Sequence, residues 1–281
     1  MMNPANQEMV NEFLLNLKLM NRSKITVQHY RNYLEHFFTG RNEAYSSVTP
    51  QDIQQWFSIH GSNLKETSIS MRLSILSSFF TFCVQEGHIE KSPIKSRWYP
   101  RLPKPIPKYL EKEEIAKTRQ QSERFSLRNQ VMFEFLLSSG CCRVAELYGL
   151  DIDLENRSAN VVGKGGKIRQ IHFSVKCAVL LEKHLESSEK GTVALFVTPT
   201  GKRLGIRRIQ IILNNIGNKA ELQASLHPHR LRHTFATELL TKGADLSFIG
   251  DELGHTDIST TQIYARLPKQ EIISLYRKYM G

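Results

Sequence analysis

A compact stretch near the end of the chain collects side chains suited to phosphoryl transfer. Residues 226–267 contain two imidazoles, a guanidinium and a phenol, contributed by His229, Arg232, His255 and Tyr264. The planar guanidinium fork of Arg232 matches phosphate oxygens through two hydrogen bonds. The phenol of Tyr264 can attack phosphorus if neighbouring groups absorb the developing charge. The stretch therefore predicts transfer of a phosphoryl group from DNA onto a tyrosine.

Three residues outside this stretch can complete a phosphate site. Arg143 follows a turn at Gly140 and begins a short helix, an odd place for a merely solvated arginine. Glu146 lies one helical turn further on, where it can orient its neighbours. Lys164 stands at the tip of a glycine-rich hairpin turn, from which it can reach into a groove. With the four residues above, they form a candidate catalytic set of seven.

The same stretch also raises a metal-site alternative. His227, His229 and His233 lie close together in the sequence, with the last two one helical turn apart. The segment HRLRH has no glutamate in the position of the zinc-binding HExxH pattern, and an arginine between ligands would repel a cation. The sequence therefore predicts no metal and no cofactor, and we expect His227 and His233 to pack or to bond backbone groups.

Composition points to a polyanionic partner without establishing one. The chain has 281 residues, is 40% hydrophobic and carries a net charge of +11. Such a charge suits nucleic acid, although a basic protein that simply stays soluble would show it too. No apolar run approaches the roughly 18 residues needed to span a bilayer, and the start lacks the features of a signal peptide. We expect a cytoplasmic protein with no membrane partner.

The first part of the chain predicts a small helical domain over residues 1–92. Apolar side chains recur at helical spacing in four segments separated by polar connections. Thr49 and Pro50 are typical of a helix start, as an N-cap followed by proline in the first turn. The four predicted helices cover residues 6–20, 24–39, 50–59 and 67–85.

A basic, proline-rich segment follows at residues 93–108. Its five prolines exclude a continuous helix or a central strand, so we expect an extended linker. Five basic side chains stand there without an acidic one between them, and the alternatives are a solvated linker and one that lies along a DNA backbone. We favour DNA contact by Lys95, Arg97, Arg101, Lys104 and Lys108.

The rest of the chain, residues 109–281, predicts a mixed domain. Two strands around the turn GKGG, within residues 158–173, interrupt a series of helices. One helix, at 206–216, begins with the basic pair Arg207 and Arg208, which are further candidate DNA contacts. A last amphipathic helix covers 268–281. The predicted class is therefore mainly α with a small antiparallel β-hairpin or sheet.

Five short motifs, in order and at fitting distances, closely resemble those of the tyrosine recombinase family, the lambda-integrase or Xer-type site-specific recombinases. They are Arg143-Val-Ala-Glu146-Leu147, the G-K-G turn at Lys164, His229-Arg-Leu-Arg232, Leu253-Gly254-His255 and Thr260-Thr261-Gln-Ile-Tyr264. One motif alone would be weak, but five in register are specific. The resemblance covers nearly the whole chain, with the N-terminal helices similar to the family's core-binding domain.

The resemblance implies a two-domain enzyme that cuts and rejoins DNA through a 3′-phosphotyrosyl intermediate. Arg143 and Arg232 would clamp the nonbridging oxygens, and His229 would take the proton of Tyr264. His255 would bond the phosphate, and Lys164, held by Glu146, would protonate the leaving 5′ oxygen. Because the tyrosyl bond conserves the phosphodiester energy, neither metal nor ATP is implied.

The sequence departs from the family's pattern at two points. Cys141 and Cys142 replace the Gly-Leu or similar pair that precedes the first arginine, and we expect altered packing there rather than lost chemistry. The hairpin also holds Lys167 and Arg169, which makes Lys164 the least secure catalytic assignment.

Four functions compete at this point. The favoured one is a recombinase that binds duplex DNA at an inverted-repeat core site as a homotetramer, exchanging helix 268–281 between neighbours, as the resemblance implies. Accessory DNA-binding proteins are an open alternative. A non-catalytic regulator would not need the complete set, a metal-dependent nuclease would lose activity in EDTA, and a relaxing topoisomerase would share the chemistry without partner exchange.

Overall fold

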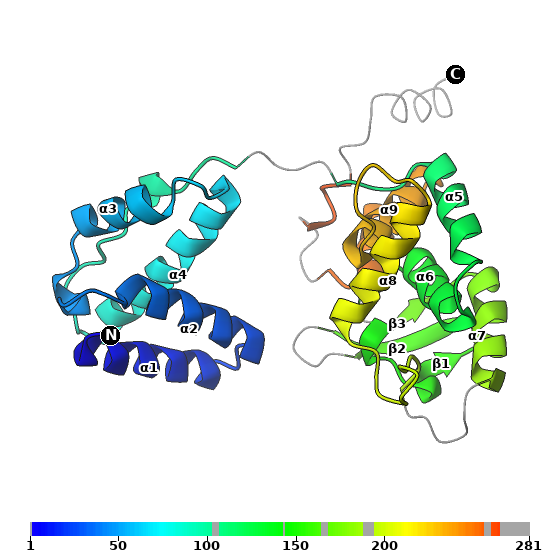
Figure 1. Cartoon of the computed structure of the whole chain (residues 1–281), viewed down its shortest axis with the longest axis horizontal. Coiled ribbons are helices and arrows are strands. Elements are labelled where there is room, and N and C mark those ends of the chain that lie inside the picture. Colours follow the sequence, from blue (N-terminus) through cyan, green and yellow to red (C-terminus); the bar gives the residue numbers. More distant parts are fainter. Residues whose placement is uncertain are drawn as a thin grey trace. The chain divides into compact units, whose positions relative to one another are not determined.

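The computed structural model describes residues 2–102, 107–142, 144–163, 168–187, 194–255 and 260–264. The chain divides into two compact units, Met1–Lys104 and Pro105–Gly281, each with its own hydrophobic core (Figure 1).

The N-terminal unit contains the four helices that the sequence predicts. They are α1 Pro4–Leu19, α2 Lys24–Phe38, α3 Pro50–His60 and α4 Glu66–Gln85. Thr49 and Asp52 form a capping box at the start of α3, with Pro50 in the first turn, as expected. The aromatic residues form the core: Phe37, Phe79 and their neighbours are fully buried, and many of their rings meet edge to face.

Helix α4 contains no long uninterrupted apolar run but is apolar on average. With a mean hydropathy of 1.3 over 18 residues, it is the one helix of the described chain long and apolar enough to cross a membrane. Its apolar side nevertheless packs in the core, where Leu76 and Phe79 are completely buried. Serines lie elsewhere on the helix, and Ser74 and Ser78 each donate to the carbonyl four residues before. Thus α4 is the core helix of a folded domain.

The predicted linker contains one short 3₁₀ turn, η2 Ser96–Trp98. Its side chains Lys95, Arg97, Arg101 and Lys108 are exposed, and the Lys95 ammonium lies 6.0 Å from the centre of the Trp98 ring. Lys104 lies outside the described residues.

The C-terminal unit surrounds helix α6, Leu127–Ser139. Between Val131 and Leu137, all six residues other than Glu134 are apolar and buried, as expected for a helix that is surrounded by the core. Glu134 is itself buried and pairs with Arg119 at 2.7 Å. The neighbouring helices are α5 Lys112–Ser122, α7 Val175–Ser187, α8 Ile206–Lys219, α9 Pro228–Thr241 and α10 Leu246–Leu253.

A three-stranded antiparallel sheet lies beside these helices (Figure 1). Strands β2 Ser158–Val162 and β3 Ile168–His172 pair in the register Ser158↔His172 to Val162↔Ile168, which confirms the predicted hairpin. The sequence did not reveal β1 Ile152–Asp153, which adds a third strand. Arg143 was expected to begin a short helix; the described residues that follow it form two short 3₁₀ turns, η3 Val144–Glu146 and η4 Gly149–Asp151. The fold is mainly α with a small antiparallel sheet, as predicted.

Candidate active site

Helix α9 presents three of the candidate side chains from one face. Pro228 occupies its first turn, and the His227 ring caps it by accepting a hydrogen bond from the Arg230 amide at 3.2 Å. Because residues three and four apart share a helix face, His229, Arg232 and His233 point the same way. Such placement is what a shared reaction site requires.

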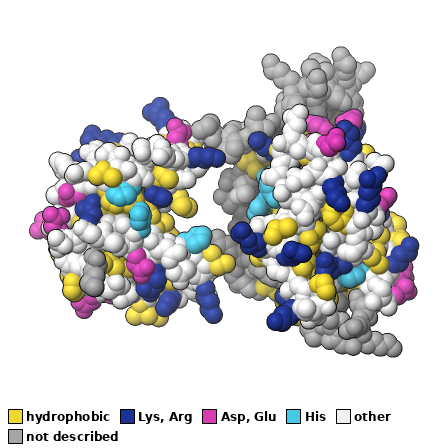
Figure 2. All heavy atoms as spheres, viewed as in Figure 1, with side chains coloured by type: hydrophobic (Ala, Val, Ile, Leu, Met, Phe, Trp, Pro, Cys, Tyr) yellow, Lys and Arg dark blue, Asp and Glu magenta, His cyan; other side chains and the backbone are white. Residues whose placement is uncertain are grey.

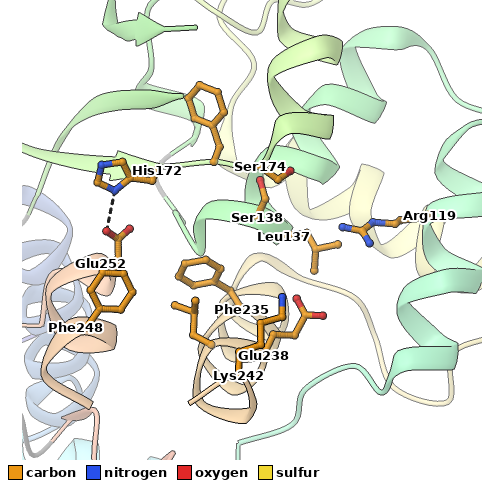
Figure 3. Close-up of a pocket in the computed structure, with 12 residues that line it drawn as sticks. Arg119, Leu137, Ser138, His172, Ser174, Phe235, Glu238, Lys242, Phe248 and Glu252 are labelled. Carbon is orange, nitrogen blue, oxygen red and sulfur yellow. Dashed lines mark hydrogen bonds and ion pairs between the residues drawn. The ribbon is translucent and has the colours of Figure 1, made fainter. Parts of the chain in front are cut away.

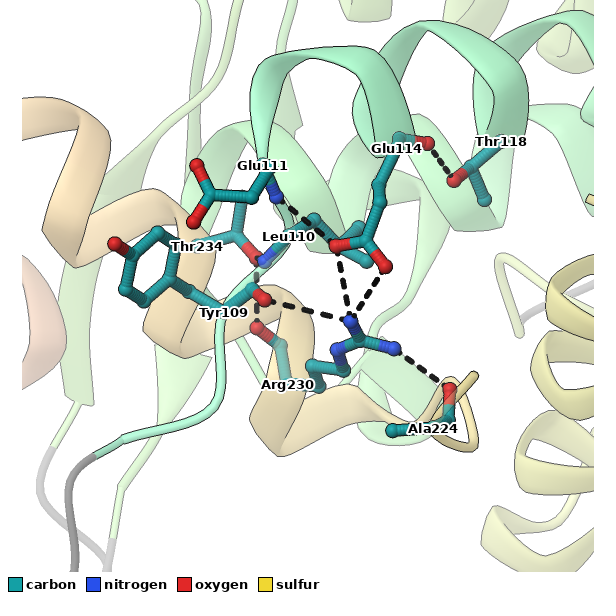
Figure 4. A network of polar contacts seen from close by, with 8 residues as sticks. All are labelled: Tyr109, Leu110, Glu111, Glu114, Thr118, Ala224, Arg230 and Thr234. Atoms are coloured by element: carbon teal, nitrogen blue, oxygen red, sulfur yellow. Dashed lines mark hydrogen bonds and ion pairs between the residues drawn. The ribbon is translucent and has the colours of Figure 1, made fainter. Parts of the chain in front are cut away.

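The other face of α9 is anchored by Arg230, a buried residue that the sequence reading passed over (Figure 4). Its guanidinium donates to the Glu114 carboxylate on α5 at 3.0 Å and to the Ala224 carbonyl at 2.6 Å. One turn on, the Thr234 hydroxyl accepts a hydrogen bond from the Leu110 amide at 2.9 Å. These bonds fix α9 in rotation and so fix the direction of its reactive face. The sequence does contain a signal for this role: Arg230 lies two residues before Arg232, a spacing that places the two arginines on opposite faces of a helix.

Arg232 joins the ends of two other helices. It donates to the Gly140 carbonyl at 3.2 Å and to the Leu253 carbonyl at 2.6 Å, where α6 and α10 end. Gly140, with φ of 61°, makes the left-handed turn that ends α6, as predicted. Both acceptors are neutral, so the positive charge of Arg232 is not cancelled by them and can act on an anion.

His255 follows directly after the end of α10. Gly254, with φ of 67°, turns the chain there, and the His255 Nδ1 lies 2.8 Å from the Thr261 hydroxyl in a hydrogen bond. Burial, with the Arg232 and Arg169 charges, lowers the pKa of His255 to about 4. The ring is therefore neutral at pH 7 in the free protein.

Tyr264 is buried, with only 3% of its surface exposed. It packs in a small cluster with Phe235, Ile249 and Leu253 from α9 and α10. Its hydroxyl lies 2.8 Å from His233 Nδ1 in a hydrogen bond. Burial raises the pKa of Tyr264 to about 12, while Arg232 acts in the opposite direction. The phenol is therefore protonated and covered in this state.

The partner of Tyr264 differs from the expectation. His233 was expected to pack or to bond backbone groups; its ring does pack against Tyr264, but its hydrogen-bond partner is the side chain of that tyrosine rather than a backbone group. His229 instead lies beside Cys142, with 3.7 Å between Nδ1 and the sulfur. The sequence of α9 alone does not show which of His229 and His233 contacts Tyr264, since both lie on the same face of the helix.

The contact between Tyr264 and His233 does not favour transfer of the phenol proton. Burial, with the neighbouring histidines and Arg232, lowers the pKa of His233 to about 4, and burial raises the pKa of Tyr264 to about 12. His233 is therefore a poor acceptor for this proton in the free protein.

Several sequence candidates lie outside the described residues. These are Arg143, Lys164, Lys104 and the helix predicted at 268–281, together with the side chain of Glu146. Of the remaining DNA-contact candidates, Arg207 and Arg208 are exposed in the first turn of α8. Lys and Arg side chains are spread over the visible face of the C-terminal unit (Figure 2). Within the described ranges, no three His, Cys, Asp or Glu side chains gather as a metal site would require.

A separate cavity of about 390 Å³ lies between α9, α10 and the end of β3 (Figure 3). Phe235, Leu239 and Phe248 give it apolar walls. At its edge, His172 Nδ1 lies 2.8 Å from Oε1 of Glu252 in a hydrogen bond. The other carboxylate oxygen of Glu252 is buried and has no hydrogen-bond partner in the described structure.

Two family models match the chain. The model described as "Phage integrase family" covers residues 108–271, and "Phage integrase, N-terminal SAM-like domain" covers residues 10–87.

Curated relatives and solved structures agree with these models. The tyrosine recombinase XerC of Oceanobacillus iheyensis is 36% identical over 277 residues, covering 92% of this chain and 90% of the relative. The XerC of Salmonella typhi is 32% identical over 270 residues, covering 90% and 89%. The crystal structure of XerA recombinase matches with a TM-score of 0.58 at 26% identity, covering 98% and 99%. A lambda integrase (75–356) dimer bound to a COC′ core site shares the fold, with a TM-score of 0.76 at 17% identity and coverage of 92% and 94%.

Proposed function

Since this chain belongs to the phage integrase family and is a XerC-like tyrosine recombinase that cuts and rejoins DNA at specific sites, we propose that Tyr264 is its nucleophile. The observation that carries the assignment is the convergence of four side chains from three segments. Tyr264 hydrogen bonds His233 of α9, and Arg232 of the same helix bonds the last carbonyl of α10. His255 follows that helix end and bonds Thr261, three residues before Tyr264.

The reaction follows from the charges of these groups. The Tyr264 oxygen attacks the scissile phosphorus, the bond from phosphorus to the 5′ oxygen breaks, and a 3′-phosphotyrosyl bond forms. The phenol proton leaves to a base, for which we propose His229, and Lys164 gives a proton to the departing 5′ oxygen. The reverse reaction with another strand's 5′-hydroxyl restores the phosphodiester, so no external energy source enters the balance.

Two arginines stabilise the transition state in this scheme. Arg232 and Arg143 bind the nonbridging oxygens, on which negative charge accumulates as the phenolate attacks. His255 donates to the same phosphate, and Glu146 orients its neighbours. Arg232 is suited to the task because its partners in the free protein are neutral carbonyls.

The nucleophile is tested by Tyr264→Phe on a nicked suicide duplex. We expect the variant to bind DNA within about threefold of the wild type and to give no covalent protein–DNA product, because only the attacking oxygen is lost. Arg232→Ala should slow covalent capture by at least about 100-fold with a much smaller effect on binding. Capture that survives in Tyr264→Phe would assign the nucleophile to another residue.

The proposed assembly is a homotetramer on an inverted-repeat core site of duplex DNA. We propose that the linker basic residues, with Arg207 and Arg208, contact phosphates, and that the protein acts in the cytoplasm, where its DNA lies. The biological role would be resolution of chromosome or plasmid dimers, transposon resolution or integration. Recombination between two marked duplexes separates this function from that of a relaxing topoisomerase.

The apolar cavity supports a docking place for the last helix of a neighbouring copy. Residues Ile272, Leu275, Tyr276 and Tyr279 make one face of the helix predicted at 268–281 apolar. Basic residues on the same segment, such as Lys278, suit the free carboxylate oxygen of Glu252 at the cavity edge.

Docking is tested by introducing a charge into the cavity. We expect Phe248→Asp to bind a single half-site normally but to lose assembly and recombination, because the apolar helix face would meet a charge. Leu150→Asp is the matched control, since Leu150 is an exposed apolar residue that does not line the cavity. Equal loss in both variants, or in neither, would remove the cavity as the docking place. Assembly is measured by native gel shift on the paired site.

A further inference from the structure

Arg169 of β3 lies across the turn that carries His255. Its guanidinium donates to the carbonyl of Glu252, in the last turn of α10. A Cβ built on Gly254 would lie 2.7 Å from Nε of Arg169 and 2.8 Å from Cζ, so a larger residue there would push the end of the arginine side chain aside. Gly254 is favoured by its left-handed backbone, with φ of 67°, and it lets Arg169 approach the turn closely. The arginine side chain and the turn form one packed unit.

The charge of Arg169 has no carboxylate partner at ion-pair distance in the described structure. The Glu252 carboxylate hydrogen bonds His172, whereas the Arg169 guanidinium donates to the neutral backbone carbonyl of Glu252. Burial lowers the pKa of Arg169, and the Arg232 charge lowers it further, while the Glu252 carboxylate offsets part of the effect. Two guanidiniums thus stand close together in a partly buried site, which is unfavourable until an anion binds between or beside them.

The groups that face His255 come from three elements. Arg232 and His233 belong to α9, Arg169 belongs to β3, and Thr261 bonds the ring directly. The positive charges disfavour protonation of His255. A DNA phosphate bound to the guanidiniums would cancel part of that charge and would itself attract a proton to the ring.

We propose that Arg169 is a positioning residue of the recombination site, which holds the Leu253–Gly254–His255 turn and keeps His255 neutral until a DNA phosphate binds. This inference rests on the proposed function of Tyr264 and His255. It places a further cation, Arg169 of β3, beside His255, in addition to Arg143, Arg232 and Lys164 of the proposed site.

The test compares Arg169→Gln, Arg169→Lys and the control Arg124→Gln in the full chain. Arg124 is an exposed arginine of the same unit, near the end of α5. Two quantities are measured: the pKa of His255, by NMR of histidine-labelled protein with His255→Asn for assignment, and the rate of covalent capture on a nicked duplex. We expect Arg169→Gln to raise the His255 pKa by at least about half a unit and to slow capture at least about tenfold. Arg169→Lys should restore most of the His255 pKa, and Arg124→Gln should change neither quantity.

A further measurement does not depend on whether Arg169→Gln folds. In Tyr264→Phe, which cannot be captured, binding of the duplex should raise the pKa of His255. If the duplex leaves that pKa unchanged, the inference is wrong. It is also wrong if Arg169→Gln slows capture without moving the His255 pKa, since that is the result of a purely structural role. Capture by Tyr264→Phe, in contrast, would overturn the proposed nucleophile and leave the Arg169–His255 coupling measurable in the free protein.

Discussion

At the scale of single residues, the two histidines of α9 are separated by their partners. His233 hydrogen bonds the Tyr264 phenol, and His229 lies beside the Cys142 thiol. Burial raises the pKa of that thiol to about 11, so it is protonated at neutral pH. These different partners agree with the proposal that His229, rather than His233, acts as the base.

Replacing each histidine by alanine should separate these roles. We expect His233→Ala to change the rate of covalent capture by less than about tenfold, because the variant loses only the hydrogen bond between His233 and Tyr264. His229→Ala should slow capture by about 100-fold or more, as expected for a lost proton-transfer group. Rates on the nicked duplex at pH 7 provide the measurement. If His233→Ala were the slower of the two, His233 would be the base.

Residue types and their spacing predicted Arg232, His255 and Tyr264 as neighbours, and the structure brings these three together. Sequence could not show that the Arg232 guanidinium is held by carbonyls at Gly140 and Leu253, because backbone acceptors leave no trace in residue identity. The pairing of Tyr264 with His233 was missed for a related reason. Helical spacing gives the face on which a side chain lies, but its partner depends on where another segment crosses that face.

At the scale of elements, the site depends on how helices end. Helix α6 ends at Gly140 and α10 ends at Gly254, both with left-handed backbone, and Arg232 of α9 bonds the last turns of both. A Cβ at Gly140 would lie 2.6 Å from Cδ1 of Phe235 and 3.0 Å from Cδ2 of Leu253. The position is therefore closed to other residues by backbone and by packing.

Gly140→Ala and Gly201→Ala form a matched pair for this claim. Gly201 also has a left-handed backbone, with φ of 73°, but a Cβ there would meet nothing within 4 Å. Gly201→Ala should lower the free energy of unfolding by about 1–2 kcal/mol from backbone strain alone. Gly140→Ala should cost about 1–3 kcal/mol more, because Phe235 and Leu253 must also move. Urea unfolding of the full chain gives both values, and equal losses would contradict the packing argument.

Periodicity predicted the helices well wherever one side is apolar, as in α2 and α4. It failed for β1, which has only two residues, Ile152 and Asp153, too few to show alternation. Helix α5 begins at Lys112, where Glu111 and Glu114 form a capping box. Local capping chemistry, rather than hydrophobic pattern, determines that boundary.

At the scale of the whole molecule, two folded units are connected through a basic segment. That segment contains the exposed side chains of Arg97, Arg101 and Lys108. None of the three forms an ion pair within the described residues. Proline content and charge predicted the segment, but whether it touches DNA depends on a complex that one chain does not contain. The same holds for the identity of the target site, since base readout depends on DNA shape as well as on side chains.

Linker contact with DNA should appear in the salt dependence of binding. Replacing Arg97, Arg101 and Lys108 together by glutamine should reduce the slope of log K against log salt by up to about 3, since each phosphate contact contributes about 0.9. The control replaces Lys18, Arg124 and Lys183, which are exposed and remove the same net charge. Fluorescence anisotropy at several salt concentrations measures both. An equal reduction in the control would show that total charge, and not the linker, sets the slope.

The covered position of Tyr264 has a consequence for the proposed reaction. On the proposal that Tyr264 is the nucleophile, its oxygen is shielded in the free protein, so cleavage would require the phenol to be uncovered first. Such shielding would keep the enzyme from cutting DNA that it contacts only briefly.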